Sequence, residues 1–129
     1  MKANELRIGN YVNRLGEPTI IEAIQKGVGI DYVSTPKSGA ITINQIEPIP
    51  LIDEILLKCE GVVVVQRGAG QEMRLIVGDF NDWNLILVLI NGVCKLEDFE
   101  GSLFFEVKYL HQLQNIYFMF YEKELKINL

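Results

Sequence analysis

Residues 107–121, VKYLHQLQNIYFMFY, are the most informative part of the chain for its fold. It contains neither glycine nor proline, so nothing in it interrupts a helix. Wound as a helix, its apolar side chains cover one broad arc: Tyr109, Leu110, Leu113, Ile116, Tyr117, Phe120 and Tyr121. The polar side chains recur at helical spacing along one stripe: Lys108, His111, Gln112 and Asn115. We therefore predict a helix over 107–121 that packs its apolar arc on the rest of the protein.

The residues before this helix predict a sheet for it to pack on. Runs rich in β-branched and other apolar residues, separated by turn formers, are typical of strands: 62–65, 73–77, 85–90, 93–96 and 102–105. Asn91-Gly92 is a strong signal for a two-residue hairpin turn. Because 85–90 is apolar throughout, we expect this strand to be covered on both faces. These patterns indicate an antiparallel sheet.

Residues 1–50 predict a second, smaller β unit. Short strand-like runs are separated by turns about every ten residues, which is typical of a small antiparallel barrel or sandwich: 8–12, 19–24, 28–35 and 40–43. In the opening, Gly9-Asn10 forms a turn that leads into the first strand. This arrangement resembles an SH3-type barrel, and a likeness of fold carries no function.

A short helix is predicted to join the two regions. Pro50 suits a helix start, because its missing N–H has no helical partner there. Acidic Asp53 and Glu54 in the first turn favour the helix dipole. Apolar residues then recur at helical spacing until Gly61, the expected stop. We predict a helix over 51–60, and the alternation in 124–129 indicates a closing strand.

The predicted fold class is therefore α+β. Residues 1–50 form a small SH3-like β-barrel unit, and residues 51–129 form the short helix, the antiparallel sheet and the C-terminal helix packed on it. The sequence leaves open whether the two units share one core. At 129 residues, 49% hydrophobic and 22% charged, the chain can bury a core without disulfide or metal support.

Charge argues against some partners. The net charge is −5, with 12 basic and 17 acidic residues. Nucleic acid is bound mainly through lysine and arginine on phosphates, so nucleic-acid binding is an alternative carried only by a few candidates in the small β unit: Arg7, Arg14, Lys26 and Lys37. The longest apolar run has six residues, whereas a membrane span needs about 20. No membrane is expected.

Cysteine usage indicates a reducing compartment. Cys59 and Cys94 are the only cysteines, and they form neither a disulfide framework nor a CxxC motif. Buried free thiols are expected, although a single bridge between the two stays open. Together with the absence of an apolar leader at the start, this predicts a cytoplasmic protein.

Motifs for chemistry are weak. Gly68 and Gly70 lack the third glycine and the following helix of a dinucleotide loop. Residues 79–84 carry Asp and Asn at some calcium-loop positions, but Trp83 and Leu85 occupy others. Cys94 with His111 and Asp98 forms a triad only if the fold assembles it. We predict no metal, no cofactor and no catalytic residue; the alternative is a small hydrolase or nuclease that uses Asp79, Asp82 and His111.

The edge of the last helix offers a candidate surface. Phe118 and Met119 fall outside the apolar arc, so either a second layer buries them or they are exposed as a partner site. His111 is expected as a solvated or hydrogen-bonded side chain on the polar stripe. The candidate binding residues are His111, Gln112, Asn115, Phe118 and Met119.

Three segments carry a resemblance to known proteins. They are 6–12 (LRIGNYV), 46–59 with its Pro48-Ile49-Pro50 core, and 108–118 with its His-Gln-Leu-Gln-Asn run. These segments resemble uncharacterised short proteins of gut-bacterial phages, prophages and mobile elements. The resemblance implies no activity and no functional residues. The acidic charge, the absence of a catalytic constellation and the aromatic-rich last helix predict a non-enzymatic protein-interaction module, from a phage or mobile element, that binds another protein or associates with itself.

Overall fold

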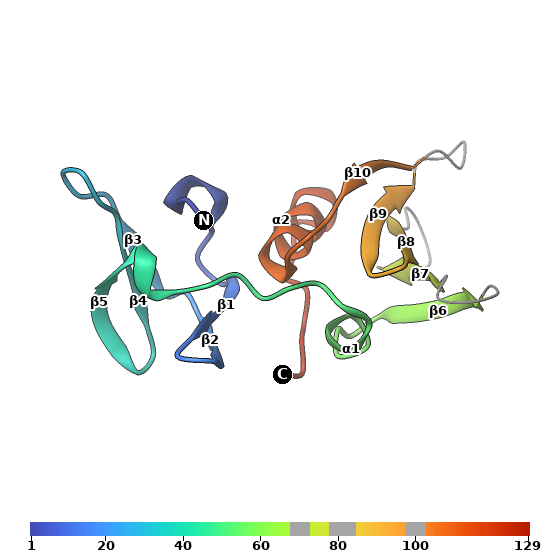
Figure 1. Cartoon of the computed structure of the whole chain (residues 1–129), viewed down its shortest axis with the longest axis horizontal. Coiled ribbons are helices and arrows are strands. Elements are labelled where there is room, and N and C mark those ends of the chain that lie inside the picture. The colour runs from blue at the N-terminus through green and yellow to red at the C-terminus, as the bar shows by residue number, and fades with distance from the viewer. Residues whose placement is uncertain (68–72, 78–84, 98–102) are drawn as a thin grey trace. The chain divides into compact units, whose positions relative to one another are not determined.

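The computed structural model describes residues 1–67, 73–77, 85–97 and 103–129. Figure 1 shows an α+β chain made mostly of strands, with a helix near its C-terminal end. The chain divides into two compact units. Unit 1 comprises Met1–Ile49 and Tyr109–Ile116, and unit 2 comprises Pro50–Lys108 and Tyr117–Leu129. The first half of the C-terminal helix thus belongs with the N-terminal residues, which the sequence patterns did not indicate.

Unit 1 holds two small antiparallel sheets. The first pairs β1 (Tyr11–Arg14) with β2 (Glu17–Ile20), and the second has the order β3-β4-β5. The remaining elements are β3 (Ala23–Gln25), β4 (Tyr32–Thr35), β5 (Ser38–Thr42) and the 3₁₀ turns η1 (Ala3–Glu5) and η2 (Ile43–Gln45). The strands form these two separate sheets and no closed barrel among the residues that the structure describes.

The chain between β2 and β3 passes from one sheet of unit 1 to the other. Ile21 N–H donates to the carbonyl of Asn10 (2.9 Å), and Glu22 N–H donates to that of Ser34 (2.8 Å). After η2, Asn13 and Glu47 exchange both backbone hydrogen bonds at 2.8 Å. Apolar side chains from all these segments form the core of unit 1: Leu6, Val12, Ile21, Val33 and Ile46.

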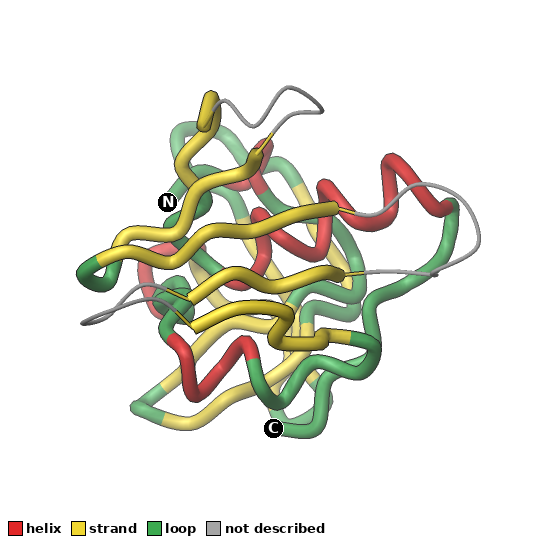
Figure 2. The backbone as a smooth tube through the Cα atoms, turned by 90° about the vertical axis from the view of Figure 1, so that its right-hand side faces the viewer, coloured by secondary structure: helices red, strands yellow, loops and turns green. Residues whose placement is uncertain are grey.

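Unit 2 is built on a five-stranded antiparallel sheet with the order β10-β9-β8-β7-β6. Figure 2 shows these strands side by side. Their bounds are β6 (Val62–Arg67), β7 (Met73–Val77), β8 (Leu85–Ile90), β9 (Val93–Glu97) and β10 (Leu103–Glu106). Leu75, Leu87 and Leu96 lie directly opposite one another across three strands and are all buried. The predicted antiparallel sheet is confirmed, and β8 is buried along most of its length.

The short helix is much shorter than predicted. Instead of 51–60, α1 covers only Asp53–Leu56. The C-terminal segment forms hydrogen bonds with the residues that would otherwise continue the helix. Glu60 N–H donates to the carbonyl of Lys126, and Asn128 N–H donates to that of Lys58, both at 2.8 Å. Cys59 and Ile127 are bridge partners. The closing strand expected at 124–129 is thus reduced to one bridge, and that pairing ends the helix early.

The C-terminal helix also starts later than predicted. α2 covers Leu110–Tyr121, whereas the pattern indicated 107–121. Val107 N–H donates to the carbonyl of Cys94 (2.8 Å), and the Lys108 carbonyl accepts from Leu51 N–H (2.9 Å). These bonds hold the two residues extended. Within the described residues, no helix is long and apolar enough to cross a membrane.

Candidate functional site

The candidate residues on α2 begin with a capping arrangement. The side-chain oxygen of Gln112 accepts a hydrogen bond from Tyr109 N–H at 3.1 Å. Tyr109 precedes the helix, and Gln112 is its third residue, so this is the return bond of a capping box. Leu110 N–H, which has no partner inside the helix, donates to the carbonyl of Ile49 (2.9 Å). Gln112 therefore helps to define the start of α2.

Gln114, which the sequence did not single out, is almost completely buried. Its side-chain oxygen accepts from Tyr11 N–H at 2.8 Å, and its amide nitrogen donates to the Gly9 carbonyl at 3.1 Å. A primary amide has one acceptor and two donors, so it can pair with a strand as a peptide group does. The side-chain amide of Gln114 thus bonds residues 9–11 as a peptide group of a neighbouring strand would.

Asn115 continues this pairing toward the N-terminus. Its amide nitrogen donates to the Glu5 carbonyl at 3.0 Å, and its oxygen accepts from Asn10 Nδ2 at 2.8 Å and from Arg7 Nε at 3.3 Å. The fully buried Asn10 accepts in turn from Arg7 N–H at 2.7 Å. These side chains form a network within unit 1. We call Asn10, Gln114 and Asn115 the amide network.

His111 is placed differently from the sequence expectation. It is fully buried instead of lying on a solvated stripe, and neither ring nitrogen has a hydrogen-bond partner within the described residues. Its ring stacks on Tyr109, with centroids 5.8 Å apart and planes 9° from parallel. The expectation of a solvated or hydrogen-bonded histidine is therefore wrong. The helix turns this position toward η1, where Ala3 is also buried.

Burial sets the protonation of His111. Loss of solvation lowers the pKa of its imidazole; the negative charge of Glu5 opposes this shift, and the terminal ammonium group adds to it. The ring is therefore neutral at pH 7, and one of its nitrogens carries a hydrogen with no partner. Such a group costs about 1–3 kcal/mol when it is buried.

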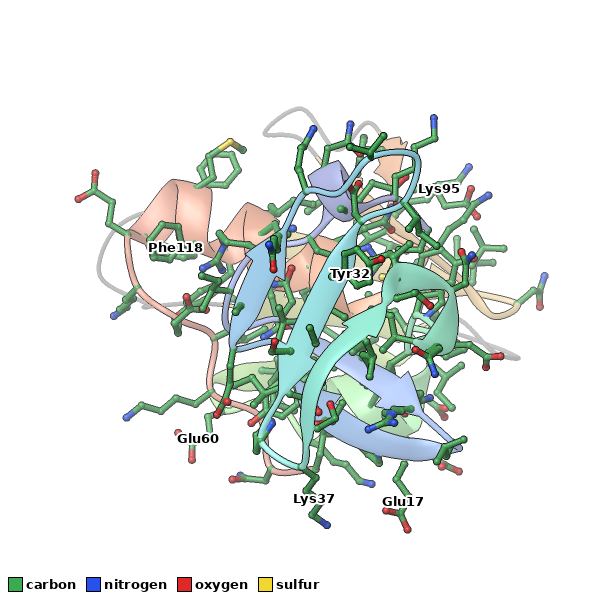
Figure 3. All side chains as sticks on the ribbon, turned by 90° about the vertical axis from the view of Figure 1, so that its left-hand side faces the viewer. Glu17, Tyr32, Lys37, Glu60, Lys95 and Phe118 are labelled. Carbon is green, nitrogen blue, oxygen red and sulfur yellow. The ribbon has the colours of Figure 1, made fainter. Side chains whose placement is uncertain are left out.

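The last turn of α2 has two different sides. Tyr117 is buried, its ring lies 4.6 Å from that of Tyr121, and the Tyr121 hydroxyl accepts from Leu85 N–H at 3.2 Å. The side chains of the three residues between these tyrosines are exposed to solvent to different degrees. Phe118 is 38% exposed, Met119 69% and Phe120 46%. Figure 3 shows Phe118 projecting from this part of the helix. We call these three residues the terminal apolar patch.

Other candidates for chemistry lie apart or outside the described residues. Gly68, Gly70, Asp79, Asp82 and Asp98 lie outside the described residues, so the structure does not test the weak dinucleotide and calcium motifs, and the hydrolase alternative stays a prediction. Cys59 and Cys94 are free and buried, and burial raises the pKa of both thiols to about 12. Thiols with such pKa values are poor nucleophiles at pH 7. Among the described side chains, no group of three His, Cys, Asp or Glu could hold a metal.

The basic residues considered for nucleic acid lie at different places in unit 1. Arg7 belongs to the contacts of the amide network, and Arg14 ends β1. Lys26 follows β3, and Lys37 lies at the tip of the hairpin between β4 and β5, where Figure 3 labels it. Arg7 thus already bonds to the protein itself.

Of the five candidates, Met119 is mainly exposed and Phe118 is partly exposed; His111 is buried, and Gln112 and Asn115 bond to backbone. Phe120, placed on the apolar arc by the sequence, joins them. Comparisons of the chain with models of protein families, with curated proteins and with solved structures found no match.

Proposed function

We propose that this chain is a non-enzymatic protein-interaction module that binds its partner through the terminal apolar patch. The observation that carries the proposal is the exposure of three consecutive apolar side chains, Phe118, Met119 and Phe120. On a helix, consecutive side chains point about 100° apart, so these three cover the end of α2 rather than one of its faces. Apolar side chains scattered singly over a surface are ordinary, whereas several at one end of an element often mark a contact site. We also propose that the protein originates from a phage or mobile element, which its resemblance to proteins of that kind supports.

The chemistry of the patch suits an adaptable contact. Aromatic residues and methionine are enriched in the centres of protein interfaces, and a methionine side chain fits irregular apolar surfaces. Three side chains supply only part of the roughly 800 Å² that each partner buries in a standard interface. We therefore propose a partner that presents a short apolar segment, with residues around the patch completing the contact.

Two further features bear on the cellular location of the protein and on the strand order of residues 1–50. The free buried thiols of Cys59 and Cys94 support a reducing, cytoplasmic location. The return of Glu47 to β1 after a 3₁₀ turn supports an SH3-like strand order for residues 1–50. A solved structure in which residues 46–48 lie away from β1 would contradict that strand order.

The interaction proposal is tested with Met119→Glu. A charge in the centre of the patch should abolish binding, because the carboxylate would lose its hydration in an apolar contact. The matched control is Leu15→Glu, which adds the same charge at a 91% exposed leucine in the turn after β1. Both changes leave buried residues intact, so both variants should fold as the wild type does.

Two measurements are needed. Light scattering after size exclusion reports self-association, and capture from host lysate, followed by titration of the identified protein, reports a partner. We expect the wild type and Leu15→Glu to bind equally and Met119→Glu to bind at least about tenfold more weakly. A protein that stays monomeric and retains no partner, or a partner that binds Met119→Glu as well as wild type, would overturn the proposal.

A further inference from the structure

Unit 1 contains an open pocket of about 370 Å³. Its walls are η1 with the residues before it, the loop between β3 and β4, and η2. Polar residues from all three walls line it: Lys2, Asn4, Lys26, Asp31 and Asn44. This volume lies within the range of small-molecule sites.

Local bonds hold the walls of this pocket. In η1, Leu6 N–H donates to the Ala3 carbonyl at 3.1 Å. In η2, Thr42 and Gln45 form a capping box, with Thr42 N–H donating to the Gln45 side chain at 3.0 Å. Ile43 N–H donates to the Asp31 carbonyl at 3.0 Å and so ties η2 to the loop. The pocket is therefore largely formed without a ligand.

The loop wall depends on Gly27. A Cβ at this position would overlap the Ile30 carbonyl oxygen and lie 2.8 Å from the Tyr32 ring. Only glycine permits this close turn, which places Lys26 and Asp31 on the same pocket. Figure 3 shows Tyr32 on β4, and Lys37 beyond the other end of that strand, in the turn to β5.

The charge of the pocket differs in sign from that of the chain. Two lysines face one aspartate, although the whole protein carries a net charge of −5. Among the residues that the structure describes, Lys2, Lys26 and Asp31 form no ion pair. The side chains of Asn4 and Asn44 likewise make no hydrogen bond there. These five polar side chains remain available to a ligand.

We propose that this pocket binds a small anionic molecule that also carries hydroxyl groups. The ammonium groups of Lys2 and Lys26 would hold its phosphate or carboxylate, since ammonium groups bind such anions as point charges. Asp31 and the amides of Asn4 and Asn44 would bond its hydroxyls. This site is independent of the terminal apolar patch.

The test is an amide NMR titration at constant ionic strength, because salt screens exposed charges and the added phosphate is itself a salt. Inorganic phosphate is the first probe. We expect saturable shifts confined to residues 2–4, 26–31 and 43–44, with a Kd on the order of 1–10 mM, as suits a few polar contacts. Lys26→Gln and Lys2→Gln should each weaken binding about tenfold, the effect of one charged hydrogen bond.

Lys37→Gln is the matched control, since it removes an exposed lysine at the other end of β4 and should leave binding unchanged. Glucose 6-phosphate is the second probe. It should bind more tightly than phosphate to the wild type, and Asp31→Asn should reduce that advantage while strengthening binding of phosphate alone. Absence of a saturable shift up to about 50 mM phosphate, or equal losses in Lys26→Gln and Lys37→Gln, would overturn the proposal.

Discussion

At the scale of single residues, the side-chain amide of Gln114 replaces a neighbouring strand for residues 9–11. It bonds the Gly9 carbonyl and Tyr11 N–H, which are 105 and 103 positions away in the sequence. Asn115 donates to the Glu5 carbonyl and accepts from the side-chain amide of Asn10. The amide network therefore supplies backbone groups of residues 5–11 with hydrogen-bond partners from α2 instead of from a paired strand.

Gln114→Ala should lower the free energy of unfolding by about 2–4 kcal/mol, because two hydrogen bonds are lost and two backbone groups keep no partner. Urea denaturation followed by circular dichroism measures this. The control is Gln25→Ala, at an exposed position in β3, for which we expect a change within about 0.5 kcal/mol. Equal effects of the two substitutions would show that the Gln114 bonds contribute nothing.

His111 should make stability depend on pH. Its pKa in the folded protein is lowered from 6.5, so the unfolded chain binds the proton more readily. The stability that depends on a neutral His111 is therefore fully present above about pH 6.5 and decreases as the pH falls below it. The loss should approach about 1.4 kcal/mol for each pH unit between the unfolded and the folded pKa.

His111→Phe keeps a ring for the stack on Tyr109 and removes the titration. The free energy of unfolding, measured by urea at about pH 7.5 and 5.5, should fall more in the wild type than in His111→Phe. Carboxylates titrate in both proteins and cancel in this comparison. An identical pH dependence of the two proteins would contradict a neutral, buried His111.

At the scale of elements, turns and tertiary pairing decide where strands and helices end. The hairpin between β8 and β9 turns at Asn91 and Gly92, with φ of 51° and 79°, as a two-residue turn of the type I′ class requires. This turn was predicted from the Asn-Gly pair alone. The ends of α1 and the start of α2, in contrast, depend on bonds to Lys126, Asn128 and Cys94.

Gly92→Ala should destabilise the protein by about 1 kcal/mol, because alanine disfavours positive φ although a Cβ there meets no atom within 4 Å. Thermal and urea unfolding both measure this. Gly39→Ala is the control: it also has free space for a Cβ but no positive φ. It should be neutral or slightly stabilising. A Gly92→Ala variant as stable as Gly39→Ala would contradict the strained turn.

At the scale of the whole molecule, one helix contributes to both units. Residues 109–116 of the chain belong to unit 1 and residues 117–121 to unit 2. Unit 1 is therefore discontinuous in sequence. Its N-terminal segment up to residue 49 obtains backbone partners from α2, which a cut at residue 50 would remove.

A fragment of residues 1–50 should therefore not fold by itself. It would lack Gln114 and Asn115, and it would expose apolar surface that residues 109–116 cover. Its amide NMR spectrum should show the narrow dispersion of an unfolded chain, whereas the full chain should show a dispersed spectrum. A well-dispersed spectrum of the fragment would show that the first fifty residues are an independent domain.

Patterns of neighbouring residues were enough to predict the local features of this protein. Alternation and β-branched runs indicated the strands of unit 2, the Asn-Gly pair indicated its hairpin, and the uninterrupted apolar arc indicated α2. These features depend on side chains within a few positions of one another, so periodicity and turn chemistry reveal them.

Which polar residues face inward depends on tertiary contacts and could not be predicted. His111, Gln112 and Asn115 look alike on a helical projection, yet the first is buried without a partner, the second caps the helix and the third bonds residues more than 100 positions away. The physical reason is that a polar side chain is buried only where distant backbone groups or a ring such as Tyr109 meet it. Local periodicity holds no information about those distant groups.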